Sequence, residues 1–374
     1  MTRGALVHEW IAPHGGSENV FEQIVQTFPD ADLHCLWSDA PQRFAGRFTR
    51  ETWLAGTPLR RTKAGALLFM PMAWRGLKGG PYDWALISSH AFAHHASFAN
   101  VTDGFRKFVY VHTPARYLWA RDLDQRGAGL LARIASPALK RLDRHRAAEP
   151  ARIAANSVFI RQRIRRSWDL DADVIYPPVD IETIQSVSDW RTELSPEELR
   201  TLQGLPRDFV LGASRFIPYK RLDLAIRAAE VAGLPAVIAG AGPLEQALRQ
   251  LAGDARIPVT FVIAPSSRLL YAIYQRASVF VFPAVEDFGI MPIESIACGT
   301  PAVVSAAGGA REGVQACGGG AVLEEHSNDA WKSALDAAAA VDRTLMREQA
   351  ARFGQTRFRR EISSWLAKPW AGNA

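Results

Sequence analysis

Short apolar runs with strand character alternate with helix-like stretches along the whole chain. In the first half, the runs predict strands at Gly4–His8, Asp32–Trp37, Trp84–Ser88, Lys107–His112, Arg152–Ala155 and Ala172–Tyr176. In the second half, they predict strands at Phe209–Ala213, Ala236–Ala239, Val259–Ile263, Val279–Phe282, Ala302–Ser305 and Ala321–Leu323. Helix-like runs lie between them, for example Arg221–Ala232, Pro243–Leu251 and Arg268–Arg276. This alternation predicts an α/β protein with two doubly wound parallel sheets.

The two predicted units meet at a pair of prolines. Pro177 and Pro178 are followed by a polar stretch from Asp180 to Pro206 with few long apolar runs. Adjacent prolines stiffen a hinge because neither supplies a backbone N–H for a strand or a helix interior. Near the other end, Thr344–Trp370 predicts a basic amphipathic helix.

Composition narrows the class of protein. The chain has 374 residues, of which 48% are apolar and 22% charged, so it is globular and long enough for two domains. It contains no run of eighteen apolar residues, and its first residues lead directly into a strand, so we expect neither a membrane span nor a signal peptide. Cys35, Cys298 and Cys317 are too scattered for a disulfide framework and fit a reducing cytoplasm.

The positive charge is concentrated in the first half. Residues 1–185 contain 24 Lys and Arg against 18 Asp and Glu, whereas the remainder contains 20 of each. Within residues 133–166 there are ten basic side chains and two acidic ones. Such a surface favours anionic partners, namely anionic lipid, a diphosphate or nucleic acid. The alternative is an ordinary solvated helical face.

The segment from Glu286 to Glu294 carries the clearest indication of chemistry. An apolar run expected as a buried strand precedes it, and Pro292–Ala297 has helix-forming character. A strand, a carboxylate-bearing loop and a helix start form a common ligand site at the carboxyl edge of an open α/β sheet. Free backbone N–H groups at a helix start suit an anionic or hydroxyl-rich ligand. We therefore expect Glu286 and Glu294 to bind two parts of one elongated ligand.

The chain resembles glycosyltransferase family 4 in seven segments that occur in family order. They are His8-Glu-Trp10 with Gly15-Gly16-Ser-Glu18, His112-Thr-Pro-Ala-Arg-Tyr-Leu-Trp119, Ala155-Asn-Ser157, Ile175-Tyr-Pro-Pro-Val-Asp180, Ser214-Arg215-Phe-Ile-Pro-Tyr-Lys220-Arg221, Glu286–Glu294 and Gly308-Gly309-Ala-Arg-Glu312. The resemblance implies a retaining hexosyltransferase with two facing Rossmann-like domains, the GT-B architecture. It implies an acceptor-binding domain at 1–185, a nucleotide-sugar-binding domain at 186–355, and a C-terminal helix at 356–374 that packs back on the first domain.

The resemblance also implies roles for residues of the second half. Transfer of a sugar from a nucleoside diphosphate leaves a dianion, which preorganised cations stabilise best. Arg215 and Lys220 match the diphosphate clamp of the family, and Glu294 matches the glutamate that binds the ribose hydroxyls. Glu286, with the backbone N–H groups of Phe288, Gly289 and Ile290, matches the segment that holds the donor sugar. A glycosidase pair of carboxylates is the poorer alternative, because such an enzyme needs no cationic clamp.

Three sites of the first half complete the expected machinery. Gly15 and Gly16 match the loop that meets the donor diphosphate, and His112 matches the family histidine that positions the donor sugar and the acceptor hydroxyl. Ser157 is expected to hold the acceptor or a phosphate, with a plain helix N-cap as the alternative. With no protein nucleophile evident, we expect a front-face mechanism in which domain closure brings the two halves of the site together.

No cofactor or metal is expected. His90, His94 and His95 lack a carboxylate partner pattern, and no loop carries an Asp-x-Asp arrangement, so we predict a metal-independent transferase. The His112 and Lys220 segments are similar to those of mannosyltransferases that build O-antigen and exopolysaccharide repeat units on lipid diphosphates. That similarity implies GDP-mannose as the donor, which is a substrate rather than a cofactor. A UDP-sugar such as UDP-glucose is the alternative donor, and a nucleotide-sugar epimerase or hydrolase is the alternative enzyme.

The acceptor side rests on a second mixed segment. Residues 60–75 combine Arg60, Arg61, Lys63 and Arg75 with an apolar, aromatic run, which predicts contact with a membrane interface and a polyprenyl-diphosphate-linked saccharide. A buried helix with a basic start is the alternative. We expect a cytoplasmic protein on the anionic inner face of the cell membrane. Nucleic acid is not an expected partner, because no helix-turn-helix or aromatic-basic RNA motif occurs.

Overall fold

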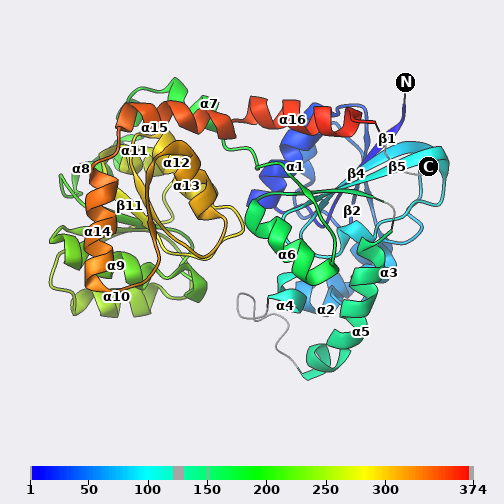
Figure 1. The fold of residues 1–374 in the computed structure, drawn as a ribbon, viewed down its shortest axis with the longest axis horizontal. Coiled ribbons are helices and arrows are strands. Elements are labelled where there is room, and N and C mark those ends of the chain that lie inside the picture. The colour runs from blue at the N-terminus through cyan, green and yellow to red at the C-terminus, as the bar shows by residue number, and fades with distance from the viewer. Residues whose placement is uncertain (1, 121–129, 150, 370–374) are drawn as a thin grey trace. The chain divides into compact units, whose positions relative to one another are not determined.

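The computed structural model describes residues 2–120, 130–149 and 151–369 (Figure 1). The chain divides into two compact units, of which unit 1 comprises residues 1–177 and 358–374 and unit 2 comprises residues 178–357. The first division therefore falls between Pro177 and Pro178, eight residues before the predicted bound, and the chain re-enters unit 1 at Phe358. Residues 370–374 of the predicted C-terminal segment lie outside the described residues.

The described part of unit 1 contains a seven-stranded parallel sheet. Its strands are β1 (Gly4–His8), β2 (Asp32–Cys35), β3 (Thr49–Glu51), β4 (Tyr82–Ser89), β5 (Val101–Val111), β6 (Arg152–Ala155) and β7 (Asp173–Val174). The spatial order is β3-β2-β1-β4-β5-β6-β7, and β1 pairs with β4 in a register that sets His8 opposite Ser88. The chain runs outward from β1 through β2 and β3 and then returns to the other side of β1. The topological switch point of this sheet is therefore between β1 and β4.

Apolar side chains of alternate strand positions bury both faces of this sheet. Leu6, Leu86 and Phe108 pack on one face with α1 (Gly16–Thr27) and with Phe358, Ile362 and Trp365 of α16 (Gln355–Ala367). Figure 1 shows these two helices together, and Arg359 Nη1 donates to Gln23 Oε1 at 3.0 Å.

The opposite face is covered by a larger set of helices. They are α2 (Lys63–Ala66), α3 (Met70–Ala73), α4 (Arg116–Trp119), α5 (Leu130–Ala147) and α6 (Val158–Trp168), with 3-10 turns at Trp53–Gly56, Pro58–Arg61 and Ala93–His95. The 3-10 turn at Pro41–Phe44 lies on the α1 face instead, where Phe44 packs against Phe21. The single helix considered for residues 60–75 is not formed, because the chain breaks there into one 3-10 turn and two four-residue helices. Met70 and Trp74 enter the core, whereas Leu68, Phe69 and Met72 remain exposed.

Unit 2 contains a six-stranded parallel sheet. Its strands are β8 (Val210–Ala213), β9 (Ala236–Gly240), β10 (Val259–Ile263), β11 (Val279–Phe282), β12 (Ala302–Ser305) and β13 (Gly320–Leu323). The order is β10-β9-β8-β11-β12-β13, so the switch point lies between β8 and β11. Nine α-helices of the described residues belong to this unit before α16: α7 (Ile181–Ser186), α8 (Pro196–Gln203), α9 (Leu222–Ala232), α10 (Glu245–Gly253), α11 (Ser267–Arg276), α12 (Ile290–Ala297), α13 (Ala310–Cys317), α14 (Asn328–Ala339) and α15 (Arg343–Gln349). Two parallel sheets covered by helices confirm the predicted α/β class with two Rossmann-like units.

The core of unit 2 also lies on both sides of its sheet. Val210, Val281 and Val303 pack against α9 and against Trp331 of α14. On the other face, the ring of Tyr274 in α11 lies 5.1 Å from that of Phe280 in β11. Both units thus leave the carboxyl ends of their strands to the connecting loops, where ligands of this fold class bind.

The predicted continuous helix over Thr344–Trp370 is wrong. The structure has α15, a 3-10 turn at Ala350–Phe353, and then α16, while Trp370 itself lies outside the described residues. The break occurs at Gly354, whose extended backbone forms a bridge with Val179. Glu182 then accepts the N–H groups of Gln355 and Thr356 at 3.1 and 3.0 Å, which caps the start of α16.

Described helices are all too short or too polar to cross a bilayer. Cys35, Cys298 and Cys317 are buried and form no disulfide with one another.

Candidate active site

Two opposite charges meet at the switch point of unit 2. Lys220 lies in the loop that follows β8, and Glu286 lies in the loop that follows the neighbouring strand β11. Lys220 Nζ forms an ion pair with Glu286 Oε1, and it lies 5.3 Å from the ring centroids of Tyr219 and Phe282. Lys220 is 8% exposed. A buried cation is therefore fixed at the carboxyl edge of the sheet by one carboxylate and two aromatic rings.

Arg215 belongs to the same loop as Lys220 but reaches solvent. Its Nη2 donates to Tyr219 Oη at 3.2 Å, so Tyr219 links the two cations of the loop. The loop is held by close backbone contact with the end of β9 and the residue that follows it. A Cβ on Gly240, whose φ is +138°, would lie 1.8 Å from the carbonyl oxygen of Ser214, so a side chain there would displace the Arg215 loop.

The loop after β11 is fixed in the same way by the loop after β12. Gly309 N–H donates to the carbonyl of Glu286 at 2.7 Å, and a Cβ on Gly308 would lie 2.8 Å from that same oxygen. Gly289, with φ of +89°, is the N-cap of α12, which begins at Ile290, two residues earlier than the predicted run. Phe288, Gly289 and Ile290 therefore lie at the start of α12, and Glu286 lies in the loop just before it. The N-terminal end of a helix attracts negative charge.

Glu294 lies one turn farther along α12 in a different environment. Burial raises the pKa of its carboxyl from 4.5 to about 7, and the charge of Asp180 adds to this increase. The charge of Glu294 in turn raises the pKa of Tyr271 and of Tyr274 in α11, after the larger effect of their own burial. Because its pKa lies near neutrality, Glu294 can both donate and accept hydrogen bonds at physiological pH.

In unit 1, His112 is joined to two neighbouring strands by hydrogen bonds. His112 follows β5, and its Nε2 lies 2.8 Å from the hydroxyl of Ser88 in β4. The same hydroxyl lies 3.0 Å from Nδ1 of His8 in β1. Burial, and next the charge of His112, lower the pKa of His8 well below its usual value, so His8 is neutral near pH 7.

A buried carboxylate missed by the sequence analysis lies beside these hydrogen-bonded side chains. Glu9 Oε1 accepts the backbone N–H groups of Ala91 and Ala93, both at 2.7 Å, and that of His90 at 3.3 Å. Burial raises the pKa of Glu9 to about 7, although these N–H groups act in the opposite direction. Glu9 thus fixes the segment that follows β4. The signal in the sequence was its place, with His8, at the carboxyl end of the first strand, but its partners lie more than eighty residues away.

The remaining predicted residues of unit 1 lie at helix starts. Gly15 is the N-cap of α1 and Gly16 its first residue. A Cβ on Gly15 would lie 1.9 Å from Glu18 Oε2, whose carboxylate accepts from the Ser17 hydroxyl at 2.8 Å. Ser157 is the N-cap of α6, because its Oγ accepts the N–H of Ile160 at 3.1 Å. This is the alternative role considered for Ser157.

The histidines near β4 have a carboxylate partner after all. Asp143 of α5 places Oδ1 3.1 Å from His94 Nε2 and 3.0 Å from His95 Nε2, which corrects the expectation that no such partner exists. Its other oxygen, Oδ2, accepts the indole N–H groups of Trp119 and Trp168, both at 2.7 Å. Burial alone would raise the pKa of Asp143, but the two histidines hold it well below its usual range. Since both oxygens already have donors, we interpret the group as a buried hydrogen-bond network and assign no metal to it.

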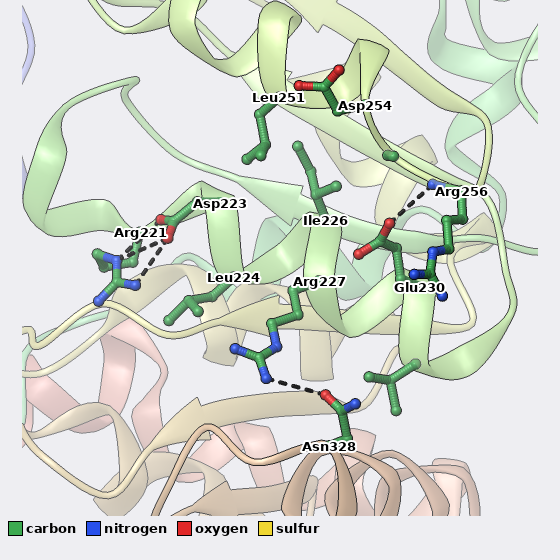
Figure 2. Close-up of a pocket in the computed structure, with 12 residues that line it drawn as sticks. Arg221, Asp223, Leu224, Ile226, Arg227, Glu230, Leu251, Asp254, Arg256 and Asn328 are labelled. Carbon is green, nitrogen blue, oxygen red and sulfur yellow. Dashed lines mark hydrogen bonds and ion pairs between the residues drawn. The ribbon is translucent and has the colours of Figure 1, made fainter.

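A groove of about 710 Å³ on unit 2 lies away from these residues (Figure 2). Several of its polar side chains bond to other residues of the groove. Arg221 pairs with Asp223 at 2.9 Å, Arg227 donates to Asn328 at 3.1 Å, and Glu230 accepts the backbone N–H of Arg256 at 2.9 Å. None of the predicted site residues lines this groove, so it does not define the candidate site.

Models of two glycosyltransferase families match the two halves of the chain. The model described as Glycosyltransferase Family 4 matches residues 14–183, and the model described as Glycosyl transferases group 1 matches residues 200–357.

Curated relatives match a shorter stretch. A D-inositol 3-phosphate glycosyltransferase from Mycolicibacterium smegmatis is 33% identical over 175 residues, which make up 44% of this chain and 38% of that protein. The protein of the same name from Mycobacterium marinum is 31% identical over 185 residues, 46% of this chain and 38% of that protein. The chain thus spans well under half the length of these relatives.

Solved structures match over nearly the whole chain. The crystal structure of Anabaena Alr3699/HepE in complex with UDP has a TM-score of 0.70 and 18% identity, covering 98% of this chain and 100% of that one. Sucrose-phosphate synthase from Thermosynechococcus elongatus has a TM-score of 0.70 and 17% identity, covering 100% of both chains. At these identities the likeness is one of fold. The comparisons support a GT-B glycosyltransferase, and the resemblance to mannosyltransferases stays a prediction.

Proposed function

We propose that the chain is a retaining, metal-independent hexosyltransferase that uses a nucleoside diphosphate sugar as donor. The observation that carries this proposal is the ion pair of Lys220 and Glu286 at the switch point of unit 2, beside the start of α12. The leaving nucleoside diphosphate gains negative charge as the glycosidic bond breaks. A fixed cation in a poorly solvated position stabilises that charge without reorganising during the reaction.

Each residue of unit 2 then has a distinct role. Lys220 and the exposed Arg215 bind the diphosphate, and Glu286 with the N–H groups of Phe288–Ile290 binds the sugar hydroxyls. Glu294 binds the ribose, where a carboxyl with a pKa of about 7 serves a diol in either protonation state. Glu286 is already engaged by Lys220, which suits a hydrogen-bonding role better than attack on the anomeric carbon.

The residues of unit 1 serve the acceptor and the sugar. His112 positions the donor sugar and the acceptor hydroxyl, and Gly15 and Gly16 present the start of α1 to the diphosphate. Ser157 acts on an acceptor or phosphate only through the helix start that it caps. In a front-face reaction, the bond from the anomeric carbon to the phosphate oxygen breaks, and the acceptor oxygen bonds to that carbon on the same face while its proton passes to the departing phosphate oxygen. The anomeric configuration is retained because the new bond forms on the face that the phosphate leaves. Product NMR that shows an inverted linkage would overturn this mechanism.

Donor identity is the first quantity to measure. GDP-mannose is the donor implied by the resemblance of the sequence, and UDP-glucose is the second candidate because Alr3699/HepE was solved with UDP-glucose. Thermal unfolding with each nucleotide sugar ranks the donors, since a ligand that binds the native state raises the melting temperature. A transfer assay then separates the enzyme classes. Donor hydrolysis or epimerisation that persists without transfer to any acceptor would contradict the transferase proposal.

The proposed acceptor is a polyprenyl-diphosphate-linked saccharide at an anionic membrane surface. Leu68, Phe69 and Met72 expose 47%, 39% and 67% of their surface between the basic residues Arg61 and Arg75. An apolar group flanked by cations suits the interface of an anionic bilayer. A phosphorylated cyclitol is the second acceptor candidate, because the matched relatives are named D-inositol 3-phosphate glycosyltransferases.

The basic segment 133–166 supports the membrane proposal less than its charge suggests. Arg161 and Arg165 pair with Asp171, and Arg146 pairs with Glu149. The side chain of Arg133 lies outside the described part of the structure. Flotation with anionic liposomes tests the proposal, with the double substitution Phe69→Ser and Met72→Ser as the variant. Equal flotation of both proteins, or flotation on neutral liposomes alone, would contradict it.

A further inference from the structure

A chain of three buried side chains crosses the switch point of unit 1. Ser88 Oγ lies 2.8 Å from His112 Nε2 and 3.0 Å from His8 Nδ1, and the three residues are 0%, 8% and 0% exposed. The three side chains come from the carboxyl ends of β1, β4 and β5, which are neighbours in the sheet. A serine hydroxyl has a single hydrogen, so Ser88 donates to one imidazole and must accept an N–H from the other.

His8 sets the direction of this chain. Its Nε2 is buried and has no hydrogen-bond partner among the described residues, and its ring stacks on Phe21 with centroids 4.8 Å apart. A buried N–H without an acceptor is rarer, and less tolerated, than a buried acceptor without a donor. Neutral His8 therefore keeps its proton on Nδ1, where it donates to Ser88. The low pKa of His8 keeps the ring neutral near pH 7.

We propose that His8 and Ser88 are positioning residues that hold His112 in the tautomer with its proton on Nδ1. His8 Nδ1–H donates to Ser88 Oγ, and the Ser88 hydroxyl donates in turn to His112 Nε2. The Nε2 lone pair of His112 is then occupied, and its other ring nitrogen carries a hydrogen. At Nδ1, His112 consequently presents a hydrogen-bond donor and not a base. This inference rests on the proposed function only for its kinetic consequence, because the tautomer exists without substrate.

Nitrogen-15 NMR of the histidine rings tests the tautomer directly. The full chain is labelled at histidine, and His112→Gln identifies the signals of His112. We expect Nδ1 of His112 to give a protonated, pyrrole-type signal and Nε2 an unprotonated, pyridine-type signal. Ser88→Ala should shift the ring towards the opposite tautomer. Ser89→Ala is the matched control, because that equally buried hydroxyl contacts His94 Nδ1 at 3.2 Å and should leave His112 unchanged.

A second variant keeps the test decisive if Ser88→Ala does not fold. His8→Phe retains an aromatic ring over Phe21 but removes the Nδ1 donor, so the Ser88 hydroxyl can donate to His112 or accept from it. Both tautomers of His112 should then be populated. A proton on Nε2 of His112 in the unsubstituted protein would overturn the proposal. So would an unchanged His112 spectrum in both variants.

The kinetic readout separates this inference from the proposed function. We expect Ser88→Ala to lower kcat for sugar transfer about tenfold, the equivalent of one hydrogen bond, with little change in KM for the donor. Ser88→Thr retains the hydroxyl and should recover most of that loss. If the protein transfers no sugar at all, the proposed function fails while the NMR result still decides the tautomer. A wild-type kcat in Ser88→Ala would overturn the role of His112 as an oriented donor.

Discussion

The ion pair of Lys220 and Glu286 makes a prediction that separates a ligand site from a structural contact. Lys220→Met removes the charge but keeps the length and the apolar contacts with Tyr219 and Phe282. It removes the ion pair with Glu286, whose side chain is 16% exposed. We expect the substitution to lower the free energy of unfolding by about 2 kcal/mol, less than for a fully buried pair because Glu286 reaches water. In a unit of this size, that corresponds to a fall of roughly 4–8 °C in melting temperature.

The effect on ligand binding should be larger than that of an ordinary surface charge. A hydrogen bond between charged groups contributes about 1.5–3 kcal/mol, so loss of Lys220 should raise the Kd for GDP or UDP roughly 10- to 100-fold. Glu286→Gln breaks the same ion pair and should cost similar stability. It removes no cation, however, and it leaves Lys220 available, so nucleoside diphosphate affinity should be retained or increased. Only transfer from the nucleotide sugar should fall.

Isothermal titration calorimetry of both variants with GDP and UDP measures this contrast. Lys332→Met in α14 is the control, because that lysine is exposed and should change neither the Kd nor the melting temperature. If Lys220→Met lowers the melting temperature but changes the Kd less than twofold, the pair is structural. Lys220 would then have no part in a diphosphate clamp.

Three further predictions concern carboxyl groups whose pKa is shifted in the folded protein. Because the pKa of Glu294 is raised in the folded protein to about 7, its contribution to stability is greatest below about pH 4.5 and is lost as pH rises through 7. Glu294→Gln should therefore make the melting temperature less dependent on pH between pH 5 and 8. A pH dependence as steep as that of the unsubstituted protein would contradict this. Glu9→Ala leaves the N–H groups of Ala91 and Ala93 unsatisfied and should lower the free energy of unfolding in urea by about 3 kcal/mol. Glu9→Gln keeps an acceptor for these groups and should lower it less. Equal losses of stability in the two variants would show that these hydrogen bonds do not contribute. Asp143→Leu removes the acceptor of two indole N–H groups and should lower the free energy of unfolding by about 4 kcal/mol. EDTA should leave the melting temperature of the unsubstituted protein unchanged. A lower melting temperature in EDTA would indicate a bound metal.

Local sequence pattern was sufficient for most of the sheets. β1, β6 and β10 occur at the predicted residues because each is a short apolar run between polar or turn-forming residues. β3 (Thr49–Glu51) was missed, since three polar residues at a sheet edge, none of them fully buried, show no apolar periodicity. The C-terminal run failed as a single helix for a different reason. Its amphipathic period continues through Gly354, but contacts with Val179 and Glu182, far away in the sequence, end one helix and start another.

The candidate site also contains residues whose place could be predicted from local sequence and contacts that could not. Lys220 and Glu286 each follow a recognisable strand, so their place at a carboxyl edge was predictable, although their direct contact depends on β8 and β11 being neighbours. The partners of His112 were not predictable by this route. His8 marks the end of the first predicted strand, but no local pattern distinguishes Ser88, and only the order of the strands brings the two side chains together. Asp143 likewise lies 48 residues from His95, with no spacing that indicates the contact.

The return of α16 to unit 1 has a consequence for how the protein is made. Phe358, Ile362 and Trp365 belong to the same buried cluster as Ile24 and Tyr110, so unit 1 lacks part of its interior until residue 366 has been synthesised. Unit 2 is continuous from Pro178 to Arg357 and needs no later segment to complete its interior. During translation unit 2 can therefore complete its core as soon as it has been made. Unit 1 is made earlier but keeps apolar surface open to chaperones until α16 has also been synthesised.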